Sequence, residues 1–400
     1  MTRPIVLTLA AAALVAGAGA GVAQQRPPAP KPPTLEELES RARQDSLDPE
    51  PHFRLAQRYY SLKRLDDEER ELRATIAIDP RYAPAYLWLG DLPFDRRPKL
   101  WQEDRKGKVP EALRAAVEQS YRLWRQAFLI DPMVDFRVIG AKPPEEGIVV
   151  VPEYGRYTTE YMLWLGLGAF GVGRYELSYG ALKSWVERAY PNQPRDSLPD
   201  FLFWYRGLSA AHQRAYKIGI EDFQVLLDRS LKAEQADTLL PFQLGTNDYR
   251  YVLAVLHQLW GKPADAMRLY QEAISADLGL YMAHVRLAQM YREYKMWGKA
   301  IEEARRAIET NPDDATAVLE LGVILAEAGR TAEAEATLGQ AAAANPRDPR
   351  PIYHLGLVRQ QLAKAGEARE ALSHFVAIAP PRRYERQIAD AKQRLAALGP

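Results

Sequence analysis

The sequence predicts an all-α protein, an α-solenoid of stacked helical hairpins. A repeat of 34 residues runs through the C-terminal half, and small residues recur at fixed places inside it. Hydrophobic residues make up 47% of the 400 residues and charged residues 26%, which is enough to build a core. The formal net charge is only +1, so the basic excess that is typical of a nucleic-acid binder is absent.

The N-terminal 23 residues have the pattern of a secretory signal peptide. Arg3 precedes an uncharged apolar run from Ile5 to Ala16, and small residues at Gly21 and Ala23 predict cleavage after Ala23. The sequence therefore predicts a periplasmic or secreted protein. An uncleaved membrane anchor is the alternative, because a span of about 20 apolar residues can cross a bilayer.

Residues 24–33 hold five prolines in ten residues, which predicts an extended tether. The chain contains no cysteine. This excludes disulfides, cysteine-ligated zinc, thiol catalysis and a lipidated N-terminal cysteine.

The repeat is clearest near the C-terminus, where several columns share one register. A residue followed by proline closes each unit, a large residue followed by a small one lies in its first helix, and an alanine lies in its second helix. The columns are Asn311-Pro312, Asn345-Pro346 and Ala379-Pro380; Leu287-Ala288, Leu321-Gly322 and Leu355-Gly356; Ala300, Ala334 and Ala368. Small residues let the two helices approach closely, and proline ends the second helix. Gly329 and Gly366 are the expected C-caps between the helices.

This pattern resembles the tetratricopeptide repeat family, of an exported bacterial type. Residues 247–382 form four in-phase units, and residues 383–400 form a C-terminal capping helix. Residues 34–132 are N-terminal units with a loop insertion at 91–109, and residues 159–246 are degenerate units. The resemblance implies a superhelix whose first helices line a concave wall.

One segment does not fit the helical pattern. Residues 133–158 alternate Val134, Phe136 and Val138 with polar residues, break at Gly140 and continue with a β-branched run. They are expected to form a β-hairpin or a loop. The segment is either a linker between helical arrays or a partner-binding finger.

Short motifs that are typical of catalytic or cofactor sites can be found in the sequence, but the residues around them do not fit such sites. Residues Gly166–Gly171 match the dinucleotide fingerprint letter for letter, but the preceding residues have helical phasing rather than the strand that this mechanism needs. Ser178 lacks the first glycine of a nucleophile elbow. The six histidines are scattered, and His52 and His284, which share a repeat position, are expected to pack structurally. No catalytic residue, metal or cofactor is therefore expected.

A partner groove remains as the candidate site. The resemblance places twelve residues on its concave wall, where apolar and amide side chains suit a docked peptide. They are Tyr251, Val255, Gln258, Met282, Val285, Gln289, Arg292, Leu319, Val323, Tyr353, Leu357 and Gln360. Alternatively, the capping helix or a second subunit covers part of this set. The Lys and Asn clamp with which some family members hold a chaperone C-terminus is absent from the matching positions.

The expected function is a non-catalytic exported scaffold or adaptor. It binds a protein or peptide partner in its groove, in the assembly of envelope or secretion complexes. The alternatives are an assembly factor held at the membrane by an uncleaved N-terminus, and an enzyme with a site on the inserted segments. A basic cluster around Arg96 and Arg105 is either a solvated loop or a contact for an acidic partner or phospholipid.

Overall fold

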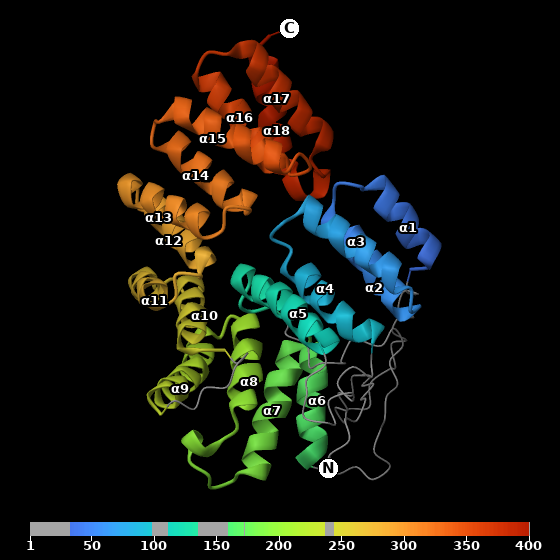
Figure 1. The fold of residues 1–400 in the computed structure, drawn as a ribbon, viewed down its shortest axis with the longest axis vertical. Helices are drawn as coiled ribbons and strands as arrows, with labels where there is room; N and C mark the ends of the chain where they lie inside the picture. Colours follow the sequence, from blue (N-terminus) through green and yellow to red (C-terminus); the bar gives the residue numbers. More distant parts are fainter. Residues whose placement is uncertain (1–32, 98–110, 135–158, 172, 237–243, 400) are drawn as a thin grey trace, which may run out of the picture. The chain divides into compact units, whose positions relative to one another are not determined.

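The described residues of the computed structural model are 33–97, 111–134, 159–171, 173–236 and 244–399. They form eighteen α-helices and a short 3-10 turn, and they contain no strand (Figure 1). The all-α solenoid predicted from the sequence is confirmed for this part of the chain. The signal peptide, the tether and nearly all of the predicted β-hairpin at 133–158 lie outside the described residues.

The chain divides into two compact units. The smaller unit comprises residues 1–34 and 135–262, and the larger unit comprises residues 35–134 and 263–400. The larger unit thus joins N-terminal and C-terminal repeats that are far apart in the sequence.

Five helices make the N-terminal part of the larger unit: α1 (Leu35–Gln44), α2 (Pro49–Ser61), α3 (Leu65–Ile78), α4 (Ala83–Arg96) and α5 (Glu111–Ile130). Phe53, Leu72 and Trp88 lie in the core that α2, α3 and α4 share. A loop was predicted from residue 91, but α4 continues to Arg96 with Pro93 in its last turn. Most of the predicted insertion at 91–109 lies outside the described residues.

The C-terminal part of the larger unit begins with α11 (Pro263–Ala276). It continues with α12 (Tyr281–Glu293), α13 (Trp297–Thr310), α14 (Ala315–Glu327), α15 (Thr331–Ala344), α16 (Pro349–Gln361), α17 (Ala365–Ile378) and α18 (Pro381–Ala397). The predicted small-residue column is the contact between paired helices. A Cβ atom at Gly322 would lie 2.7 Å from Leu338, and one at Gly356 would lie 2.7 Å from Leu372. Leu287, Leu321 and Leu355 are all buried, as one register requires.

The turn inside each hairpin repeats with the same period. A residue with positive φ stands at equivalent places, at Lys63, Lys295, Gly329 and Ala363. The prediction that Gly366 caps its helix was wrong, because Gly366 lies inside α17 and Ala363 takes the left-handed conformation instead. A non-glycine residue in that conformation costs roughly 1–2 kcal/mol, which the surrounding packing must offset.

The smaller unit contains α6 (Thr159–Gly171), α7 (Tyr175–Ala189), the 3-10 turn Arg195–Ser197, α8 (Asp200–His212), α9 (Tyr216–Gln235) and α10 (Thr246–Leu259). Gly166 packs on Leu182 as Gly322 packs on Leu338, and a Cβ atom added at Gly166 would lie 2.6 Å from Leu182. The glycine fingerprint therefore lies in a helix of a repeat, not after a strand. Ser178 is buried and hydrogen-bonded to Ser209 at 3.0 Å.

The two histidines that share a repeat position make the same contact. His52 Nδ1 lies 2.7 Å from Glu71, and His284 Nδ1 lies 2.7 Å from Glu303. Each pair joins the first helix of a hairpin to the second helix. Each histidine therefore joins the two helices of its repeat through a polar side-chain contact.

Candidate partner-binding site

The twelve residues predicted to line the groove divide into two groups. Six are buried: Tyr251, Val255, Met282, Val285, Leu319 and Val323. The other six are half-buried: Gln258, Gln289, Arg292, Tyr353, Leu357 and Gln360. Most of the apolar wall is thus core in this structure, and its use by a partner stays a prediction.

Part of the wall is covered by the capping helix α18, the alternative that the sequence left open. The Tyr353 hydroxyl donates to Asp390 at 2.7 Å, and Arg394 donates to Gln360 at 2.9 Å. Leu357 packs against the apolar cluster that α18 shares with α16 and α17. Elsewhere on the wall, Gln289 of α12 donates to Glu320 of α14 at 2.9 Å, so its amide is engaged in a contact between two hairpins.

Within the larger unit, helix α5 meets the start of α12. Gln126 donates to the hydroxyl of Tyr281 at 2.6 Å, and Arg125 lies 3.2 Å from Asp277. Arg286 donates to the backbone carbonyl of Ile130 at 2.8 Å. That carbonyl belongs to the last turn of α5, where a cation also complements the helix dipole.

A second contact joins the α3–α4 turn to the C-terminal repeats. Asp79 is 6% exposed, and its carboxylate lies 2.5 Å from Arg383 and 4.0 Å from Arg350. Burial alone would raise the pKa of Asp79, but the two guanidinium groups and the backbone N–H of Arg81 hold it below its usual value. Asp79 with Arg350 and Arg383 is called the clasp below.

Arg81 lies two residues after Asp79, on the same turn. Its Nε is buried and makes no hydrogen bond in the structure. Burial, and after it repulsion by Arg350, lowers the pKa of Arg81, while Glu320 and Asp314 partly compensate. The turn therefore brings a desolvated guanidinium close to charged groups of the C-terminal repeats.

A cavity of about 420 Å³ opens where these segments meet, and it is called the junction cavity here. Its walls are Ile76, Ala77, Pro80, Tyr86 and Gln126 from the N-terminal repeats, and Asn311, Asp313, Asp314, Ala315, Ala344 and Asn345 from the C-terminal repeats. The Nδ2 of Asn345 is buried and has no hydrogen-bond partner. Burial and the charges of Asp314 and Asp79 raise the pKa of Tyr86, so its hydroxyl stays protonated. The cavity thus offers hydrogen-bond donors to an acceptor such as a peptide carbonyl.

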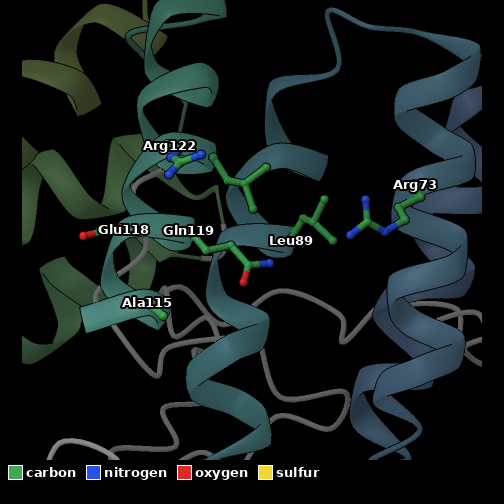
Figure 2. A pocket seen from close by; sticks show the side chains of 7 residues that line it. Arg73, Leu89, Ala115, Glu118, Gln119 and Arg122 are labelled. Carbon is green, nitrogen blue, oxygen red and sulfur yellow. The ribbon is translucent and has the colours of Figure 1, made fainter. Parts of the chain in front are cut away.

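A second cavity, of about 430 Å³, lies among α3, α4 and α5. Figure 2 shows Arg73 and Gln119 extending toward Leu89 from opposite sides, while Glu118 points away. Ala115, Arg122 and Leu123 complete its lining. This cavity belongs to the N-terminal repeats alone.

Two further features were sought in the part of the chain that the structure describes. It holds no group of three or more histidine, aspartate or glutamate side chains arranged to bind a metal ion. Across the same ranges, no helix combines the length and the apolar character that crossing a bilayer requires.

Part of the helical array matches a known family. Residues 291–355 match the family model of the tetratricopeptide repeat. This stretch carries tetratricopeptide repeats. It includes the hairpin of α14 and α15, in which Gly322 faces Leu338. No curated protein matches the sequence.

Solved structures of tetratricopeptide repeat proteins are similar to the chain. The C-terminal part of a repeat protein from Cytophaga hutchinsonii is 12% identical, covers 60% of this chain and 87% of its own, and has a TM-score of 0.45. Yeast Tom70 is 14% identical, with coverages of 90% and 91% and a TM-score of 0.39. YrrB, described as having an unusual peptide-binding site, is 15% identical, with coverages of 50% and 92% and a TM-score of 0.36.

The clasp was missed by the sequence analysis, although a signal for it exists. Asp79 and Asp277 stand at the repeat position that Asn311 and Asn345 occupy in the regular units. The structure pairs both aspartates with arginines of distant repeats. A charged residue in a column that is otherwise neutral could therefore have marked the junction.

Proposed function

We propose that the protein is a non-catalytic scaffold that binds a protein or peptide partner at the junction cavity of its larger unit. The observation that carries this proposal is the buried, unpartnered Nδ2 of Asn345 in the wall of that cavity. A buried donor without an acceptor costs about 1–3 kcal/mol, and a peptide carbonyl would recover it. The cavity volume falls within the range typical of ligand sites, roughly 300–1,000 Å³.

The partner would enter as an extended segment that places one or two side chains in the cavity. Ile76, Ala77 and Ala315 provide apolar contact, while Gln126 and Asn345 provide hydrogen bonds. Such a mixed lining suits a peptide better than a charged small molecule.

Two neighbouring alanines allow a matched test. Ala344 lines the cavity and Ala343 does not, although both are exposed near the end of α15. The tagged protein is used to capture partners from its own host, as wild type, Ala344→Trp and Ala343→Trp. Ala344→Trp should fill the cavity and lose the partner, whereas Ala343→Trp should keep it. Equal capture by both variants would place the binding surface elsewhere.

The protein would work outside the cytoplasm, in the assembly of envelope or secretion complexes. This part of the proposal is supported by the pattern of residues 1–23. The alternative, an assembly factor with an uncleaved membrane anchor, is separated by N-terminal sequencing of the mature protein. A start at Gln24 supports export, and a start at Met1 or Thr2 supports the anchor.

A further inference from the structure

The α3–α4 turn contacts the C-terminal repeats through an acidic side chain, as a peptide ligand with a carboxylate could. It consists of Asp79-Pro80-Arg81-Tyr82, and Asp79 is joined to Arg383 across 304 residues of sequence. The backbone N–H of Arg81 donates to the Asp79 carboxylate at 3.0 Å, which fixes the turn locally. The carboxylate is therefore presented by a short, ordered segment.

Arg350, the first of the two receiving arginines, is positioned without the help of Asp79. Arg350 is held by Asp348, the N-cap residue of α16, through Nε at 2.9 Å and Nη2 at 2.7 Å. Asp348 is itself buried. Arg383 begins α18, and its side chain keeps 38% exposure. If Asp79 left, Arg350 would thus keep its place, and the guanidinium of Arg383 would be open to another carboxylate.

The clasp joins a buried carboxylate to guanidinium groups that are partly open to water, with side-chain exposures of 8% for Asp79, 22% for Arg350 and 38% for Arg383. Arg125 and Asp277, which hold the neighbouring part of the junction, keep 22% and 36% exposure of their side chains. An ion pair as exposed as that of Arg125 and Asp277 contributes little and weakens with salt, so it does little to hold the neighbouring turn. A partner that offers a carboxylate and further contacts in the adjoining cavity can therefore compete with the turn.

We propose that Arg350 and Arg383 form a binding site for an acidic side chain of the partner, and that Asp79 occupies this site in the free protein. The inference rests on the proposed function of the junction cavity, and it adds the chemistry of the partner. A basic side chain is disfavoured at this point, because Arg81 lies close to Arg350. The partner is a peptide that presents a carboxylate here and displaces the turn.

The test uses the full-length protein and two fluorescein-labelled peptides. One copies residues 75–85 of the chain, and the other is identical except that asparagine replaces the aspartate. Binding is measured by fluorescence anisotropy at low salt to four proteins: wild type, Asp79→Asn, Asp79→Asn with Arg383→Gln, and Asp79→Asn with Arg382→Gln. Arg382 is the exposed neighbour of Arg383 and serves as the matched control. Circular dichroism checks that each variant is folded.

Asp79→Asn should bind the aspartate peptide at least tenfold more tightly than wild type does. The asparagine peptide should bind this variant at least tenfold more weakly, and Arg383→Gln, but not Arg382→Gln, should abolish the gain. Failure of a folded Asp79→Asn protein to bind the peptide, or equal binding of both peptides, would overturn the inference. Such a failure would leave the proposed function standing if Ala344→Trp still lost the captured partner.

Discussion

The hairpins of the smaller unit and those at the C-terminus share one packing device and differ in what surrounds it. In both, a glycine of the first helix faces a buried leucine of the second helix: Gly166 on Leu182, and Gly322 on Leu338. In the next hairpin of the smaller unit, Gly207 faces Asp222 instead, and this fully buried carboxylate is paired with Arg206 and Arg195. The small residue is thus the constant feature of the hairpin, while the residues around it differ between the two regions.

The largest loss of stability is expected at the buried Asp222 of the smaller unit. Asp222→Ala should destabilise the protein by about 3–5 kcal/mol, because Arg206, with a side chain only 15% exposed, would lose its carboxylate. Urea denaturation followed by far-UV circular dichroism measures the change. Arg195→Gln is the control, since Arg195 is 42% exposed and its loss should have a small effect. Equal losses for the two variants would show that Asp222 is not buried as described.

The next effect should be the same in both regions. Leu182→Ala and Leu338→Ala each remove a fully buried side chain beneath a glycine. Each should cost about 2–5 kcal/mol, because a cavity remains that glycine cannot fill. Thermal unfolding of the two variants tests this expectation. If only Leu338→Ala were costly, the smaller unit would not share the packing of the C-terminal repeats.

The dependence of stability on acid pH should distinguish the clasp from the two groups of hairpins compared above. The pKa of Asp79 is lowered in the folded state, so its ion pairs stabilise the protein above the unfolded value of about 3.9 and are lost as the pH falls through the folded pKa. Asp79→Asn should therefore reduce the loss of stability between about pH 5 and pH 3. The measurement is the melting temperature at several pH values, compared with Asp313→Asn, which removes an exposed carboxylate. Identical acid profiles for Asp79→Asn and wild type would contradict the clasp.

The sequence predicted the repeats because their packing is local. The column at Leu321-Gly322 and the alanine at Ala334 lie within one hairpin, so their spacing carries the contact directly. The contact of Asp79 with Arg383 joins residues 304 positions apart, and no local period encodes it. The resemblance placed Tyr353 and Gln360 on one wall, but it left open whether the capping helix would cover them.

The claim that a small residue of the first helix interlocks with a large residue of the second helix, as Gly322 does with Leu338, is tested most directly by one pair of substitutions. Gly322→Ala places a Cβ atom 2.7 Å from the buried Leu338, while Gly339→Ala, on the adjacent helix, meets open space. Overpacking should cost about 1–3 kcal/mol at the first site, and helix propensity should add about 0.5–1 kcal/mol of stability at the second. The melting temperature should fall for Gly322→Ala and rise for Gly339→Ala. A rise for both would contradict the account.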